Sequence, residues 1–492
     1  MRSVILFIEV LRSQPSAVFW AAALAQAALW WLVPAIFFAA PPDGLPIVLA
    51  VGHQFRFGTE FGPPLGYWFA EVVYSGLGLT GVYLAAQICV VIAYWAVFAL
   101  GRAIVGARHA AIAVLLMAGV FAFTLPTVDF GAAILALPLW ALALLFYWRA
   151  AGEGRHRYWL ALGVDLGLLL LTTYAGLVLI VLLLAFTLAT QTGRERLMTV
   201  EPFVAGLIVL VILFPWLTWL DLNGGISFAP FAAIEQHLGA WLALVSSLAL
   251  GHAGILLLVA TGFGRARTRQ DAPIIERTPV DPLARRFVVT FALAPVVVML
   301  ALAPFASGAR AYVAAPLVLL TALAVVTLAS DRLRIVHQRL AAWVWAVVLI
   351  LPPIAVAGAL VLSPWLYPTE LKLAQPAAEL GRIFAGNFQT RTGRPLTIVA
   401  GDARLASLIA MSAPRPTLYL DATPELTPWV TPREVARSGA LVVWPAGETR
   451  LPPAAIRERF PGLAAEPVQV FARPGRLPPL RIGWAIIPPR PQ

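Results

Sequence analysis

The chain has 492 residues, of which 60% are hydrophobic and only 12% are charged, with a mean hydropathy of +0.84. Soluble domains are about 45–50% apolar and about 25% charged, so this composition excludes a soluble enzyme and indicates a membrane protein. The formal net charge is +11, but the basic residues stand in short groups between apolar runs. Since no basic face is formed, a nucleic-acid partner is excluded. The single cysteine, Cys89, excludes an intrachain disulfide.

Eleven apolar runs follow one another along the chain, and about 20 apolar residues are needed to cross a bilayer as a helix. The runs are continuous instead of alternating, which excludes a membrane-spanning strand barrel. The fold class predicted is therefore an all-α polytopic membrane protein with about eleven transmembrane helices, over residues 16–40, 79–101, 109–126, 131–148, 158–173, 175–191, 202–220, 239–262, 287–306, 311–330 and 341–363.

The arginines are concentrated in every second segment that connects these helices. If the N-terminus is cytoplasmic, the segments on the cytoplasmic side hold eighteen arginines, whereas the outer loops between helices hold only Arg56 and Arg310. Cytoplasmic loops carry an excess of basic residues in membrane proteins. The pattern predicts a cytoplasmic N-terminus and, with eleven spans, an extracytoplasmic C-terminus.

The tail after residue 363 has the composition of a soluble domain, so we predict two domains, 1–363 in the membrane and 364–492 outside it. Short apolar runs in the tail alternate with helical patterns, which is typical of a small α/β domain. Strands are predicted at 395–400, 417–420, 441–444, 468–471 and 481–487, with helices at 403–412, 432–438 and 454–460.

The first external region, residues 41–78, is too apolar and aromatic for a solvated linker, so we predict short helices lying in the membrane interface. Asp43 begins this region in the run Pro41–Pro42–Asp43–Gly44. A carboxylate at this depth can accept a proton from an acceptor hydroxyl as a general base. The alternative is a solvated loop residue after a helix. Further acidic residues near this face are Glu60, Asp129, Asp221 and Glu235.

Several segments resemble glycosyltransferase family 39, the bacterial relatives of protein O-mannosyltransferases of the GT-C superfamily. The external region resembles the family's first loop, with an acid after the first helix and an aromatic stretch that leads to a Pro pair and Tyr67–Trp68. The helix at 137–142 and the returning helix at 157–163 form a second similarity. Looser matches are Leu170–Tyr174, Val399–Asp402, Thr427–Val430 and Gly439–Trp444.

The resemblance implies a multi-span body with its active site on the extracytoplasmic face of the bacterial inner membrane. The donor would be a polyprenyl-phosphate-linked sugar, and the acceptor a lipid, polysaccharide or protein. The acceptor hydroxyl would attack the anomeric carbon in line and invert it, with Asp43 as the base. The implied partners are the lipid-linked donor, the envelope acceptor and membrane lipids.

A polyprenyl phosphate needs a cation near the outer surface. Arg56, Arg310 and Lys372 are the outer cations near the membrane, although each could also be a solvated or snorkelling side chain. The loop residues expected to line the substrate site are His53, Glu60, Tyr67 and Trp68. His53 and Glu60 make no cluster with metal-ligand spacing, so no metal site and no cofactor are predicted.

One stretch and three single positions depart from the family pattern. The stretch is Phe130–Gly131–Ala132–Ala133, where members have a polar, Asn-containing stretch before Leu-Pro-Leu-Trp. Pro46 stands where members often carry a second acid, Gly62 where His or Lys is usual, and Thr173 where Lys is usual. A catalytically degenerate member that acts as an assembly partner is therefore an alternative. A lipid or glycan transporter is another alternative, although the membrane segments hold few candidate ionisable groups. These are chiefly Asp165 and His252, which lie mid-span and could pair with each other.

Overall fold

The computed structural model describes the whole chain except residues 1–8, 60, 223–233, 263–273, 303–314, 335–336, 369–370, 413, 421–423, 447–451 and 490–492. The chain forms two compact units. The first comprises residues 1–32, 83–128 and 132–354, and the second comprises residues 33–82, 129–131 and 355–492. The domain boundary after residue 363 stays a prediction.

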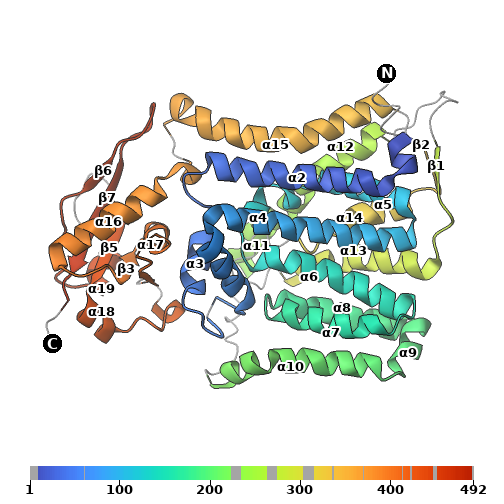
Figure 1. Cartoon of the computed structure of the whole chain (residues 1–492), viewed down its shortest axis with the longest axis horizontal. Coiled ribbons are helices and arrows are strands. Elements are labelled where there is room, and N and C mark those ends of the chain that lie inside the picture. The colour runs from blue at the N-terminus through green and yellow to red at the C-terminus, as the bar shows by residue number, and fades with distance from the viewer. Residues whose placement is uncertain are drawn as a thin grey trace. The chain divides into compact units, whose positions relative to one another are not determined.

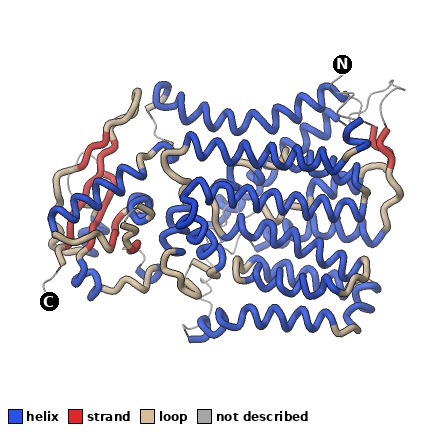
Figure 2. Tube along the Cα trace, viewed as in Figure 1, coloured by secondary structure: helices blue, strands red, loops and turns tan. Residues whose placement is uncertain are grey.

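Helices occur in each of the eleven apolar runs (Figures 1 and 2). They are α2 (Pro15–Phe37), α4 (Leu65–Ile104), α5 (Ala107–Met117), α6 (Ala132–Tyr147), α7 (Arg157–Leu170), α8 (Ala175–Ala189), α9 (Gln191–Leu197), α10 (Glu201–Leu222), α11 (Ile234–Gly251), α12 (Ala253–Gly262), α13 (Pro282–Leu302), α14 (Thr321–Leu328) and α15 (Gln338–Leu366). Two short strands pair antiparallel with each other. They are β1 (Ile274–Glu276), between α12 and α13, and β2 (Arg332–Arg334), between α14 and α15.

Seven of the described helices or joined helices are long and apolar enough to cross a membrane. Two bent pairs, α5 with the following turns to Val128 and α8 with α9, raise this number to nine within the described part of the chain. The other two predicted runs contain α7 and α14, which have only 14 and 8 residues. The polytopic helical fold is therefore confirmed, with seven to nine candidate spans against about eleven predicted.

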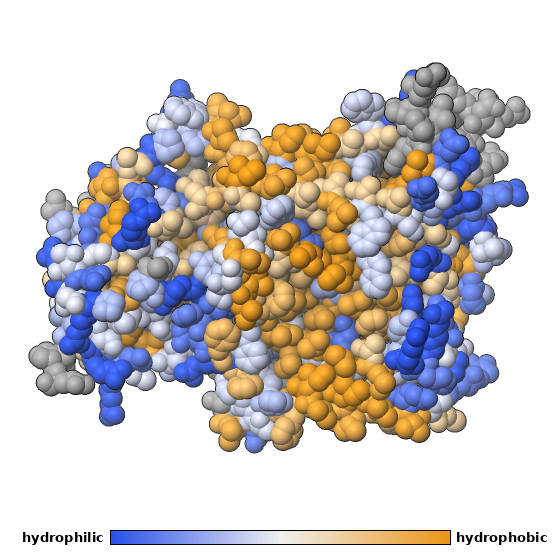
Figure 3. Space-filling model, in the orientation of Figure 1, coloured by the Kyte–Doolittle hydropathy of each residue, from blue (hydrophilic) through white to orange (hydrophobic). Residues whose placement is uncertain are grey.

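Helices α7 and α10 pack closely because α7 presents small residues to its neighbour. A Cβ atom added at Gly163 would lie 2.7 Å from the carbonyl oxygen of Ala205, and one at Gly167 would lie 2.9 Å from Ile212. Small residues four apart allow helix backbones to approach in membranes. The opposite side of α10 exposes large apolar residues, such as Leu207 and Phe214. Figure 3 shows apolar side chains over the helices of the first unit and hydrophilic ones at the end that carries α9, β1 and β2.

The external region contains two helical pieces, as predicted. One is α3 (Leu45–Gly52), and the other is the first part of α4, which is interrupted at Gly78. The φ of +64° at Gly78 suits glycine because an L side chain rarely adopts it. The predicted helix at 79–101 therefore begins after this break. That α3 and the first part of α4 lie in the membrane interface stays a prediction.

The tail forms the predicted small α/β fold around a five-stranded sheet in the order β4-β3-β5-β7-β6. Strands β3 and β4 are parallel to each other and to β5, whereas β7 is antiparallel to β5 and β6. The strands are β3 (Ile398–Gly401), β4 (Thr417–Tyr419), β5 (Ala440–Pro445), β6 (Gln469–Phe471) and β7 (Leu480–Ile487). The helices are α16 (Ala377–Thr392), α17 (Ala403–Ala410), α18 (Pro432–Ser438) and α19 (Ala454–Arg459), of which α16 was not predicted.

Candidate functional site

Asp43 lies in the segment that joins α2 to α3, and each of its carboxylate oxygens meets a cation. Lys372 Nζ is 2.6 Å from Oδ2, and Arg404 Nη1 is 3.0 Å from Oδ1. The Asp43 side chain is half exposed. The Asp43 site, defined as Asp43, Lys372 and Arg404, is therefore an accessible carboxylate between two cations.

Backbone contacts place Lys372 beside the end of α2. The Pro41–Pro42 pair has no N–H groups with which to continue a helix. Just before it, the N–H groups of Ala39 and Ala40 both donate to the carbonyl oxygen of Leu373, each at 3.0 Å. Because Lys372 precedes Leu373, its ammonium reaches Asp43. The pair is exposed on both sides and contributes little to stability, so the lysine can exchange this carboxylate for another anion.

Arg404 comes from the tail and is held by more contacts than Lys372. It belongs to α17, whose N-cap Asp402 accepts a hydrogen bond from the N–H of Leu405. Arg404 Nη2 donates to the carbonyl oxygens of Pro41 (3.0 Å) and Lys372 (3.1 Å). Its side chain is only 15% exposed, against 65% for that of Lys372. Arg404 thus orients the Asp43 carboxylate and ties the two adjoining segments together.

Asp129 supports the backbone next to Asp43. Its carboxylate accepts hydrogen bonds from the N–H of Leu45 (2.8 Å) and the N–H of Gly44 (3.2 Å). Burial raises the pKa of the Asp129 carboxyl above its ordinary value, and these two hydrogen bonds oppose that shift. A Cβ atom on Gly44 would lie 2.9 Å from the carboxylate, so glycine permits the close approach.

A second polar cluster joins α3, α4 and the segment before β4. Glu71 on α4 is buried, and its two oxygens meet His53 Nδ1 at 2.9 Å and Arg415 Nη2 at 2.5 Å. Arg415 also lies over the ring of Tyr74, 4.7 Å from its centroid. His53 is therefore an anchor of the loop that follows α3, in addition to its predicted place in the substrate loop.

The aromatic residues of the predicted substrate loop fold that loop onto itself. Trp68 Nε1 donates to the carbonyl oxygen of Arg56 at 3.0 Å, and the Tyr67 hydroxyl donates to the carbonyl oxygen of Phe61 at 3.1 Å. The guanidinium of Arg56 lies 5.4 Å from the ring centroid of Trp429. Arg56 thus has a cation–π partner in the tail, separate from the contacts of Asp43.

The predicted site residues are therefore brought together only in part. Asp43 contacts Lys372, whereas His53, Tyr67 and Trp68 have other partners. The predicted residues Glu60 and Arg310 lie outside the described residues. Sequence reasoning missed Arg404, Glu71 and Arg415, and it mentioned Asp129 only as an acid near this face. In the described chain, no three His, Cys, Asp or Glu residues are grouped to hold a metal ion, and the roles of all these residues stay predictions.

The two mid-span ionisable residues have separate surroundings. His252, between α11 and α12, contacts the carbonyl oxygen of Leu248 at 2.6 Å and the hydroxyl of Thr321 at 3.4 Å. Asp165 is buried on α7. The contact of His252 with Thr321 replaces the pairing with Asp165 that the sequence suggested.

Comparisons with known proteins agree with the predicted family and fold. Residues 62–219 match the family described as dolichyl-phosphate-mannose-protein mannosyltransferase. The structure of ArnT from Cupriavidus metallidurans in the apo state superimposes with a TM-score of 0.61 at 16% identity, covering 97% of this chain and 99% of that one. The same protein bound to undecaprenyl phosphate gives a TM-score of 0.60 at the same identity and coverage. No curated protein sequence matches the chain.

At 16% identity the similarity to ArnT shows the fold, and the family model adds a similarity in sequence over residues 62–219. Both agree with the resemblance to family 39, which is thereby confirmed. The chain is a polytopic membrane protein with the fold of ArnT, and its residues 62–219 match the model of the dolichyl-phosphate-mannose-protein mannosyltransferase family.

Proposed function

We propose that the chain is an integral-membrane glycosyltransferase that moves a sugar from a polyprenyl-phosphate donor to an acceptor hydroxyl on the extracytoplasmic face. The observation that carries the proposal is the Asp43 site, an accessible carboxylate between Lys372 and Arg404. The family match and the GT-C fold support the reaction class. The undecaprenyl phosphate bound by ArnT supports a polyprenyl-phosphate donor.

In the proposed reaction, the acceptor oxygen attacks the anomeric carbon while Asp43 takes the proton of its hydroxyl. The bond between that carbon and the phosphate oxygen breaks, and its electron pair leaves with the polyprenyl phosphate. Attack opposite to the leaving group inverts the anomeric carbon. Arg404 keeps the Asp43 carboxylate oriented, since its guanidinium also bonds the backbone on either side.

Lys372 is the residue proposed to receive the donor phosphate. Its ammonium is exposed and pairs with Asp43, whose side chain is half exposed. A phosphate can therefore replace the carboxylate as the partner of Lys372. This exchange also frees the Asp43 oxygen that must accept the proton. No protein metal ligand or cofactor is required for these steps.

The departures from the family pattern have structural roles that are compatible with an active enzyme. Pro46 lies in the first turn of α3, where a missing N–H costs little. Gly62 has a φ of +126°, a conformation that suits glycine. Thr173 accepts a hydrogen bond from the N–H of Ala175 at the start of α8. We therefore favour an enzyme whose tail supplies the phosphate-binding cation over a degenerate assembly partner.

Replacing Lys372 by Gln is expected to weaken binding of polyprenyl phosphate about ten- to a hundredfold, because a charge-assisted hydrogen bond is lost. The measurement is the Kd of the purified protein for undecaprenyl phosphate in detergent. Arg382→Gln is the matched control, since Arg382 is an exposed cation on nearby α16. Equal affinities of the parent and the Lys372 variant would assign the phosphate to other cations.

The proposed orientation places the N-terminus in the cytoplasm and the tail outside the inner membrane. The arginine-rich connections support it, because they gather at one end of the first unit. Gly154, between α6 and α7, lies against Arg196 of α9, and β1 pairs with β2 near the same end (Figure 1). Basic residues favour the cytoplasmic side.

A reporter that is active only outside the cytoplasm is expected to work when fused after Gln492 and to stay inactive when fused after Glu153. A reporter active only in the cytoplasm is expected to show the reverse pattern. The fusion after Glu153 is the internal control, since it lies in an arginine-rich connection. Cytoplasmic signals from both sites would indicate an even number of spans and overturn the orientation.

The sugar that is transferred and its acceptor can be identified by comparing a deletion strain with its parent. Mass spectrometry of surface lipids, polysaccharides and envelope proteins is expected to show one class that lacks a single sugar residue. Recovery of that sugar with the parent gene, but not with the Asp43→Asn gene, would connect the product to this site. An unchanged envelope that nevertheless loses an assembled complex would favour the assembly partner.

A further inference from the structure

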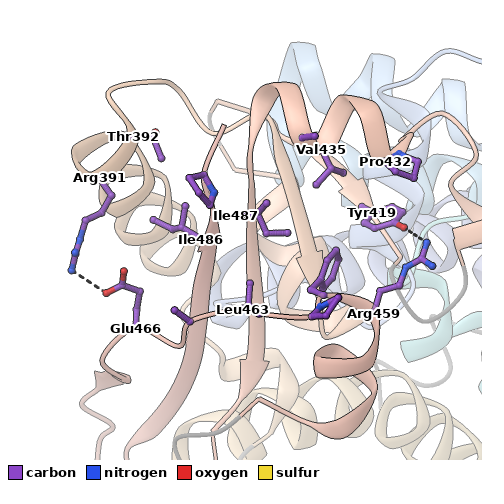
Figure 4. Close-up of a pocket in the computed structure, with 16 residues that line it drawn as sticks. Arg391, Thr392, Tyr419, Pro432, Val435, Arg459, Leu463, Glu466, Ile486 and Ile487 are labelled. Atoms are coloured by element: carbon purple, nitrogen blue, oxygen red, sulfur yellow. Dashed lines mark hydrogen bonds and ion pairs between the residues drawn. The ribbon is translucent and has the colours of Figure 1, made fainter. Parts of the chain in front are cut away.

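A cleft of about 910 Å³ lies in the α/β part of the tail, within the second unit (Figure 4). It is formed by the end of α16, β4, α18, α19, the segment that follows α19 and the end of β7. Its volume falls within the range of about 300–1,000 Å³ that is common for small-molecule sites. None of the residues of the Asp43 site lines it.

The middle of the cleft is apolar, and its two ends are polar. Figure 4 shows Val435, Leu463 and Ile487 between the two ends. Tyr419 and Phe460 add an aromatic wall, with ring centroids 6.3 Å apart. Apolar and aromatic surface of this kind can pack against the face of a sugar ring that presents C–H groups.

Each end of the cleft carries an arginine. At one end, Arg391 Nη2 is 3.0 Å from Glu466 Oε2, and the arginine side chain is 56% exposed. At the other end, Arg459 donates to the hydroxyl of Tyr419 and lies over its ring. Figure 4 marks both contacts with dashed lines. Both guanidinium groups can form paired hydrogen bonds with a carboxylate or a phosphate.

The surroundings of the cleft are positively charged. The segments 391–394, 432–438 and 454–466, which carry most of the lining residues, contain six arginines and three glutamates. A ligand with negative groups therefore complements this part of the tail, whereas a cationic ligand is disfavoured. The pair of Arg391 with Glu466 is partly exposed, so the arginine is accessible to a second anionic group.

We propose that this cleft binds an acidic oligosaccharide, with sugar rings against the apolar and aromatic wall and anionic groups on Arg391 and Arg459. The proposal goes beyond sugar transfer at Asp43, because it assigns a separate carbohydrate-binding site to the tail. Such a site holds an anionic envelope glycan on the same chain as the proposed transferase. It does not depend on whether Asp43 is a catalytic base.

The test is isothermal titration calorimetry of the full-length protein in detergent with trigalacturonate and, as the neutral counterpart, galactotriose. Trigalacturonate is expected to bind at least about tenfold more tightly than galactotriose. Arg391→Gln and Arg459→Gln are each expected to weaken trigalacturonate binding about ten- to a hundredfold. Ala436→Trp, which fills the cleft from α18, is expected to abolish binding.

Arg457→Gln is the matched control, because Arg457 lies on α19 with Arg459 but does not line the cleft. Its affinity is expected to equal that of the parent. Absence of trigalacturonate binding, equal binding of the neutral sugar, or unchanged affinity in both arginine variants would overturn the proposal. Loss of binding in Lys372→Gln with no loss in Arg459→Gln would overturn it too, since the ligand would then occupy the Asp43 site.

Discussion

Asp43→Asn is expected to lower the rate of sugar transfer by about 10²–10⁴-fold, because positioned general-base catalysis contributes that much. The asparagine keeps the shape of the side chain and its contacts with hydrogen-bond donors, but it cannot take the acceptor's proton. The variant also loses two ion pairs, with Lys372 and Arg404. Lys372 is exposed, and Arg404 keeps its hydrogen bonds to the carbonyl oxygens of Pro41 and Lys372 and can still donate to the asparagine oxygen. The protein is therefore expected to fold and insert in the membrane at normal abundance.

The measurement is transfer of labelled sugar from a polyprenyl-phosphate donor in membranes that contain equal amounts of parent or variant. Glu379→Gln is the control, because Glu379 is an exposed carboxylate on α16 away from these contacts. A variant at position 43 that transfers sugar as fast as the parent would reduce Asp43 to a structural loop residue. Absence of transfer by both proteins, with every donor offered, would support the degenerate member.

Glu71→Ala is expected to lower the free energy of unfolding by about 3–5 kcal/mol. The reason is that removal of the carboxylate leaves the largely buried guanidinium of Arg415 without its ion-pair partner. The carboxylate of Glu71 is only 4% exposed and holds Arg415, whose side chain is 17% exposed, as well as His53. The measurement is equilibrium unfolding in mixed micelles. The change is expected to be among the largest from a single polar side chain in this protein.

The double variant Glu71→Ala with Arg415→Ala separates loss of a contact from burial of an unpaired charge. Its stability is expected to lie above that of Glu71→Ala alone, because no guanidinium is then left without its carboxylate. Glu71→Gln is expected to fall between the parent and the alanine variant, since the amide still accepts one hydrogen bond. Equal stability of Glu71→Ala and the parent would show that the pair contributes nothing to folding.

Local sequence patterns predicted most of the secondary structure. The helix at 432–438 is an example, because Thr431 caps it, Pro432 opens it and Gly439 ends it. Apolar runs located the helices in the membrane, but their lengths were overestimated at α7, which ends at Leu170, just before Thr172–Thr173. Composition alone could not show where a helix breaks, as it does at Gly78.

The site could be predicted only where its residues stand in one short segment. Asp43 follows from its position after the first helix and from the family pattern. Its partner Lys372 is 329 residues away, and Arg404 contacts Pro41 across 363 residues. Nothing in the spacing of the chain brings such segments together, and Arg404 looks like an ordinary surface residue of an amphipathic helix. The same holds for Arg415 and Glu71, which are 344 residues apart.

The origin of the two cations beside Asp43 has a consequence for how the protein is made. The ribosome synthesises Asp43 with the first helix, but both of its charged partners belong to the last quarter of the chain. During synthesis the Asp43 carboxylate therefore has neither of these partners while the first helices are made, and both ion pairs form only after the tail has been synthesised and folded. A nascent or prematurely terminated chain carries the acid without the groups that orient it, so the Asp43 site is complete only in a chain that includes the tail.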